Sequence, residues 1–79
     1  MDYEKARKNE LRGALASNVK HLRLIRGFSQ EQLAEVCGYH RTYIGSIERG
    51  ERNITRSTLE ALAEALRVLP ATLLEDKSG

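Results

Sequence analysis

Apolar residues recur every three or four positions in the first third of the chain, which is the spacing of one helix face. They stand at Leu11, Leu15, Val19, Leu22 and Ile25, and Gly27 follows them. The spacing predicts a first core helix that starts near residue 11 and ends at Gly27. Residues 1–10 form a charged lead-in before this helix.

Two short helices are predicted next. Ser29 stands three residues before Gln32, so its hydroxyl can accept a hydrogen bond from the free backbone N–H of Gln32 in a capping box. The second helix then stops at Gly38. A third short helix is predicted over residues 41–49, with Gly50 at its end.

The last third predicts two more helices. Thr55 or Ser57 can cap the fourth, whose inner face carries Leu59, Leu62, Ala63 and Leu66. Pro70 suits the first turn of a brief fifth helix. Since no stretch alternates apolar with polar residues for long, we expect an all-α, five-helix domain over residues 11–75 and a frayed tail over 76–79.

The second and third helices predict a helix-turn-helix. Gly38 supplies the left-handed backbone that a tight corner needs, and the small Ala34 stands where the two helices approach closely. One apolar seam is shared by Leu33, Cys37, Tyr39, Ile44 and Ile47. Gly45, inside the third helix, permits close approach either of DNA or of another helix, at about 1 kcal/mol of helix propensity.

Composition narrows the function classes. The 79 residues suffice for one small domain with a net charge of +2, which says little about partners. The single cysteine, Cys37, cannot form an internal disulfide, and no zinc-ligand spacing is present, so we expect no metal, no cofactor and a cytoplasmic location. No apolar run nears the ~20 residues that span a membrane. No acid–base pair or activated nucleophile supports an enzyme.

The chain resembles the Xre or lambda-repressor-like family. The resemblance rests on Gly27-Phe28-Ser29-Gln30-Glu31-Gln32-Leu33-Ala34 and on Ile47-Glu48-Arg49-Gly50, and it spans about residues 11–74. The run from His40 to Thr55 is most similar to the controller proteins of restriction-modification systems. The resemblance implies a lambda-repressor-like fold, binding to double-stranded DNA, control of the chain's own gene and an endonuclease gene, and RNA polymerase as a candidate partner.

A recognition helix aims its N-terminal residues at base edges in the major groove. Arg41 can pair with guanine O6 and N7, and Thr42 can bond a base edge or touch a thymine methyl group. Ser46, one turn further on, is expected to reach a base or a phosphate. We predict these three residues as base contacts.

Contacts to the sugar-phosphate backbone of DNA are predicted from the second and third helices and from the loop after the third helix. The resemblance makes Gln30 a phosphate clamp and brings Arg49, Arg52 and Asn53 to phosphates or to the minor groove. Tyr43 is expected against sugar-phosphate, with a partly buried structural role as the alternative. Lys20 and Arg26 are either further phosphate contacts or plain surface cations.

Other residues are expected to be structural. The resemblance implies an interior ion pair between Arg23 and Glu48. We expect Tyr39 and Cys37 inside, His21 on the surface, and His40 as a poor helix cap or a phosphate neighbour.

The C-terminal third holds more apolar residues than one inward stripe can use. A self-complementary patch of Val68, Leu69, Leu73 and Leu74 is predicted to form a two-fold homodimer on a palindromic operator. The alternative is that these residues complete a monomer's core. Alternative functions are a phage-type repressor or an antitoxin-like module that binds a protein partner.

Overall fold

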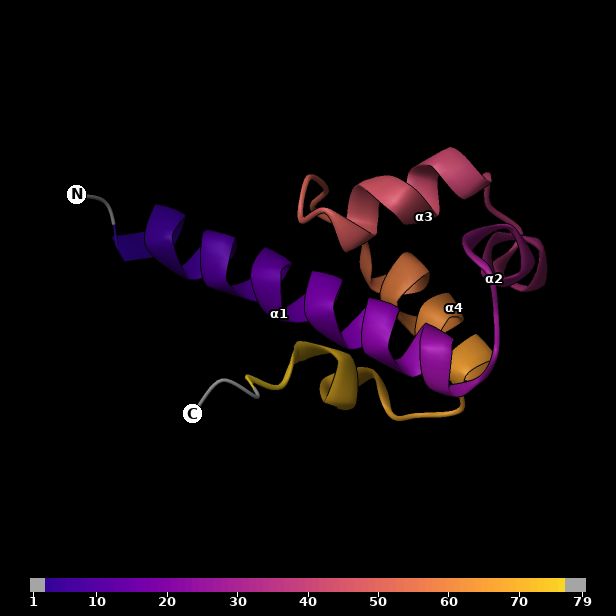
Figure 1. The fold of residues 1–79 in the computed structure, drawn as a ribbon. Coiled ribbons are helices and arrows are strands. Elements are labelled where there is room, and N and C mark those ends of the chain that lie inside the picture. Colours follow the sequence, from indigo (N-terminus) through magenta and orange to yellow (C-terminus); the bar gives the residue numbers. More distant parts are fainter. Residues whose placement is uncertain (1–2, 77–79) are drawn as a thin grey trace.

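The computed structural model describes the backbone of residues 3–76 and the side chains of residues 10–76. Its elements are α1 (Tyr3–Ile25), α2 (Gln30–Cys37), α3 (Arg41–Glu48), α4 (Arg56–Leu66) and the 3-10 helix η1 (Pro70–Leu74). The described part of the chain contains no strand, which confirms the all-α prediction (Figure 1).

The predicted count of five helices is wrong, because within residues 3–76 four segments are α-helical and the fifth is a 3-10 turn. Pro70 opens this segment, and its bonds span three residues, as from Thr72 N–H to Leu69 C=O at 2.9 Å. A run of five residues is too short for a stable α-helix but suits the tighter 3-10 geometry.

The first helix begins at Tyr3 and not near residue 11, so most of the predicted lead-in continues α1. No proline interrupts residues 3–10, and their lysine, arginine, glutamate and alanine residues are good helix formers. Figure 1 shows this end of α1 extending past the rest of the bundle. Residues 1 and 2 of the lead-in and residues 77–79 of the predicted frayed tail lie outside the described residues.

Local caps set most helix boundaries. Gln32 N–H donates to Ser29 Oγ at 3.0 Å while Ser29 N–H donates to Gln32 Oε1 at 2.8 Å, which confirms the predicted capping box. Gly38 ends α2 in the left-handed conformation with φ 80°. Thr55 caps α4, where its Oγ1 accepts from Thr58 N–H at 3.2 Å.

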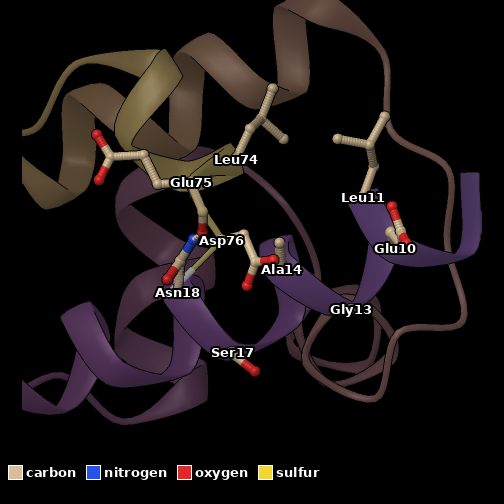
Figure 2. A pocket seen from close by; sticks show the side chains of 9 residues that line it. All are labelled: Glu10, Leu11, Gly13, Ala14, Ser17, Asn18, Leu74, Glu75 and Asp76. Atoms are coloured by element: carbon tan, nitrogen blue, oxygen red, sulfur yellow. Dashed lines mark hydrogen bonds between the residues drawn. The ribbon is translucent and has the colours of Figure 1, made fainter. Parts of the chain in front are cut away.

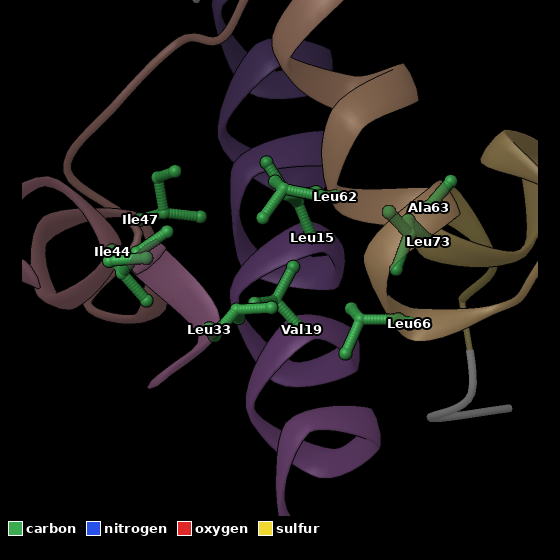
Figure 3. Packing of buried hydrophobic residues seen from close by; sticks show 10 residues of the cluster. Leu15, Val19, Leu33, Ile44, Ile47, Leu62, Ala63, Leu66 and Leu73 are labelled. Atoms are coloured by element: carbon green, nitrogen blue, oxygen red, sulfur yellow. The ribbon is translucent and has the colours of Figure 1, made fainter. Parts of the chain in front are cut away.

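The core forms where α1, the helix-turn-helix and α4 pack together (Figure 3). Side chains from every element meet there: Leu15, Val19, Leu33, Ala34, Ile44, Ile47, Leu62, Ala63, Leu66 and Leu73. Each large one stabilises the fold by about 1.5–3 kcal/mol relative to an exposed side chain. Leu73 is fully buried, so its predicted place in a dimer surface is wrong, because η1 turns this side chain inward against α1 and α4.

Candidate nucleic-acid interface

The N-terminus of α3 presents two polar side chains to the surface. Arg41 and Thr42 are both exposed, and His40 caps the helix ahead of them with Nδ1 accepting from Thr42 N–H at 3.1 Å. His40 is therefore a working cap, although histidine is not a preferred residue for that position. The cap orients the first turn of α3 and so the side chains it carries.

Arg41 has an acidic neighbour on α2. Its Nη1 lies 3.2 Å from Glu31 Oε2, and the two side chains are 67% and 70% exposed. A pair this exposed contributes at most about 1 kcal/mol, so Arg41 can leave it for another acceptor at little cost. Glu31 was not among the predicted site residues, and its one signal in the sequence is its acidic side chain in the first turn of α2.

The corner between α1 and α3 is held by a buried ion pair. Arg23 Nε lies 2.6 Å from Glu48 Oε2, and Arg23 Nη2 donates to Glu48 Oε1 at 3.1 Å. Arg23 Nη1 also donates to Phe28 C=O at 2.8 Å. The structure thus contains the interior pair that the resemblance implied, and it fixes the end of α3 against α1.

Glu48 also receives a bond from α2. Gln30, exposed at the start of α2, donates from Nε2 to Glu48 Oε1 at 3.1 Å. A Cβ atom added to Gly45 would lie 3.4 Å from Gln30 Oε1 and 3.1 Å from Arg49 Nη1. Because Gly45 has no side chain, the side chains of Gln30 and Arg49 can lie close to α3 at this point. Gly45 thus permits close packing within the protein.

The loop after α3 carries three exposed polar side chains that were predicted to reach the DNA backbone, Arg49, Arg52 and Asn53. Arg49 makes a two-bond contact with Glu51, at 3.0 and 3.2 Å. These hydrogen bonds lower the pKa of Glu51, which therefore stays charged at neutral pH. Glu51 is a second acidic neighbour that sequence reasoning missed.

Ser46 lies away from the exposed face. It is buried, with 4% of its surface exposed, and its Oγ donates to Tyr43 C=O at 2.7 Å. The same Oγ accepts from Arg52 Nε at 3.1 Å. A base edge cannot reach a hydroxyl enclosed in this way, so the predicted base contact of Ser46 is wrong.

The two tyrosines pack together. Their ring centroids lie 5.2 Å apart, and the Tyr39 hydroxyl bonds Thr58 Oγ1 at 2.9 Å. Tyr43 is half-buried against the core, and Arg52 Cζ lies 5.6 Å from its ring centroid. The structural alternative for Tyr43 thus has direct contacts in its favour, while the exposed part of the ring stays beside Arg52.

Two residues have the structural places that were expected. Ala34, 2% exposed, lies on the core side of α2. The backbone N–H of Tyr39, just after Gly38, donates to Ala34 C=O at 2.9 Å and closes the corner.

Of the two cations expected either at phosphates or on the plain surface, Lys20 is exposed, and Arg26 donates from Nε to Leu66 C=O at 3.1 Å.

An open groove of about 710 Å³ lies between α1 and η1 (Figure 2). Leu11 of α1 and Leu74 of η1 line it, together with Glu10, Glu75 and Asp76. Asn18 joins its two sides by donating from Nδ2 to Leu73 C=O and Glu75 C=O, each at 2.9 Å.

Comparison with known proteins identifies the fold and the family. A helix-turn-helix (HTH_3) family model matches residues 19–73, which is more than half of the chain. The chain belongs to the Xre-like helix-turn-helix family. Control protein C.SmaI of Serratia marcescens is 55% identical over 65 residues, which are 82% of this chain and 77% of that protein.

Solved structures of helix-turn-helix regulators have the same fold. The hypothetical transcription factor NHTF from Neisseria superposes with a TM-score of 0.84 at 41% identity, over 89% of this chain and 79% of that one. The restriction-modification controller protein C.AhdI from Aeromonas hydrophila superposes with a TM-score of 0.75 at 37% identity, over 78% of this chain and 94% of that one. The family is one of DNA-binding regulators. Within the described residues, no helix combines the length and apolar character needed to cross a membrane.

Proposed function

We propose that this protein is a homodimeric transcription regulator that binds a palindromic operator and acts as the controller of a restriction-modification system, on its own gene and the endonuclease gene. The observation that carries the proposal is the position of Arg41 and Thr42, exposed on the capped first turn of α3. The similarity to C.SmaI and C.AhdI supports the controller role. RNA polymerase remains a candidate partner of such a regulator.

In this proposal Arg41 and Thr42 read bases in the major groove. Arg41 gives up its exposed pair with Glu31 and turns its guanidinium to guanine. Phosphate and sugar contacts flank this reading site, and we assign them to Gln30, Tyr43, Arg49, Arg52 and Asn53. Their side chains lie on α2, on α3 and in the loop that follows α3. In a helix-turn-helix the first of the two helices crosses the DNA backbone while the second lies in the major groove.

The dimer surface is proposed at the C-terminal end of the described chain. Leu69 is 74% exposed and Leu74 is 36% exposed, while Val68 is half-buried against the core. Leu74 faces Leu11, itself 41% exposed, across the groove of Figure 2, so α1 adds apolar surface to the patch. A two-fold axis through this patch would place two copies of α3 about 34 Å apart, one turn of DNA.

Selection of bound sequences from a random pool of duplexes tests the proposal. We expect one palindromic sequence to emerge, with half-sites one helical turn apart, and sedimentation at micromolar concentration to give a dimer. The selected duplex should bind at least about 10³-fold more tightly than an unrelated one at the same salt concentration. A pool that shows no enrichment would exclude sequence-specific regulation.

A further inference from the structure

We infer that Ser46 is a positioning residue that, together with the ring of Tyr43, holds the Arg52 guanidinium in one orientation for a phosphate oxygen of DNA. The inference rests on the proposed DNA binding and deepens it. It gives the buried hydroxyl a role in the interface without any contact to DNA.

The hydrogen bonds of Ser46 account for its burial. The hydroxyl donates a hydrogen bond to Tyr43 C=O and accepts one from Arg52 Nε, so its donor and an acceptor position are both used inside the protein. Ser46 is only 4% exposed, and burying its hydroxyl without such partners would lower the stability of the fold. The bond to Arg52 also joins α3 to the loop that follows it, across six residues of sequence.

Tyr43 supplies the second constraint on Arg52. The Arg52 Cζ atom lies 5.6 Å from the ring centroid, within the range of a cation–π contact. The ring is itself held by Tyr39, whose hydroxyl bonds Thr58 of α4. The ring that Arg52 rests on therefore belongs to α3 and is joined through Tyr39 to α4.

The bond to Ser46 uses the Nε–H group of Arg52, and the Tyr43 ring lies against the guanidinium. The four N–H groups of the two Nη atoms are then left to bind an anion. Two charged neighbours in the same loop, Arg49 and Glu51, are paired with each other. Arg52 lowers the pKa of Glu51 through its charge, although less than Arg49 does. An arginine that is already ordered loses less conformational freedom on binding, which raises affinity by about three- to tenfold for one side chain.

The test compares Ser46→Ala, Arg52→Ala and the double variant by fluorescence anisotropy on a duplex at several salt concentrations. Ser46→Ala should weaken binding by about three- to tenfold on every sequence. Arg52→Ala should weaken it further and reduce the slope of log K against log salt by about one. The double variant should bind no worse than Arg52→Ala, because Ser46 acts only through Arg52.

Two controls keep the result specific. Ser57→Ala removes an exposed hydroxyl at the start of α4 and should bind as the unaltered protein does. Arg52→Lys keeps the charge but lacks Nε, so it should keep the salt slope and lose affinity about as much as Ser46→Ala. This variant also tests the inference without altering a buried group, should Ser46→Ala fail to fold.

Hydrogen exchange of the Arg52 Nε–H, followed by NMR without DNA, gives an independent readout. Exchange should be slow in the unaltered protein and at least several-fold faster in Ser46→Ala. Equal exchange rates, or losses of affinity that add in the double variant, would overturn the inference. Absence of any DNA binding by the unaltered protein would refute the proposed function, while the exchange rates would still decide whether Ser46 orders Arg52.

Discussion

Arg23 and Glu48 form a two-bond ion pair between α1 and the last residue of α3, with side chains only 9% and 4% exposed. The pair joins residues 25 positions apart in the sequence. Gln30 of α2 donates to the same carboxylate, so one buried acid connects the three helices that shape the proposed interface. The orientation of the recognition helix therefore depends on an electrostatic contact as well as on apolar packing.

Removing one partner of this pair should be costly. Arg23→Leu leaves the Glu48 carboxylate buried without its partner, and we expect the free energy of unfolding in urea to fall by about 3–5 kcal/mol. The exposed pair Arg56–Glu60, with side chains 91% and 57% exposed, provides the control. Arg56→Leu should change stability by no more than about 1 kcal/mol. Equal effects of the two variants would show that burial does not set the strength of the pair.

Arg41→Ala tests the base-reading assignment. We expect it to weaken binding to the selected operator by about 1–3 kcal/mol while binding to unrelated duplexes hardly changes. Competition titrations at fixed salt measure both quantities. Glu31→Gln is the matched control, since it removes the negative charge that faces Arg41 but keeps the guanidinium. An equal loss on every sequence would make Arg41 a phosphate contact instead.

The effect of Gly38 on stability can be compared with that of Gly13, a glycine inside a helix. Gly38→Ala forces a side chain into a φ of 80° and should lower the free energy of unfolding by about 1–2 kcal/mol. Gly13 lies within α1, and a Cβ added there meets no atom within 4 Å. Gly13→Ala should therefore raise stability by about 0.5–1 kcal/mol. Thermal and urea unfolding distinguish the two, and destabilisation by Gly13→Ala would contradict the open environment.

Leu73 and Leu74 are adjacent but should respond differently. Leu73→Ala creates a cavity in the core and should cost about 2–5 kcal/mol of stability. Leu74→Glu places a charge on the proposed dimer surface and should shift sedimentation toward the monomer, at a smaller cost in stability than Leu73→Ala. If Leu74→Glu remains dimeric, the dimer surface lies elsewhere.

Partial burial raises the pKa of the Cys37 thiol above its ordinary value. The thiol therefore stays protonated at neutral pH, and alkylation by iodoacetamide should begin at a higher pH than in an unstructured cysteine peptide. Because the folded pKa is the higher one, stability is fully present below the ordinary thiol pKa and declines as the pH rises through the raised value. Alkylation rates with and without urea measure the difference, and equal midpoints would contradict it.

The sequence by itself determined the features that depend on neighbours a few residues apart. The Ser29 capping box and the left-handed Gly38 each involve bonds or dihedral angles within one turn, so residue type and spacing suffice to predict them. For α4 they narrowed the cap to Thr55 or Ser57, and the structure shows Thr55. The exposure of Arg41 and Thr42 at the first turn of α3 follows from the same local register. The family resemblance, and not the spacing, indicated the pairing of Arg23 with Glu48.

Tertiary structure alone decided which side of a helix or turn meets the rest of the molecule. Periodicity placed Ser46 on the outer face of α3, but the following loop brings Arg52 back onto its hydroxyl. The apolar pattern likewise cannot separate a core leucine from an interface leucine, and only the turn of η1 against α1 buries Leu73 while leaving Leu74 partly exposed. Both outcomes depend on contacts between segments distant along the chain, whose relative placement residue spacing does not encode.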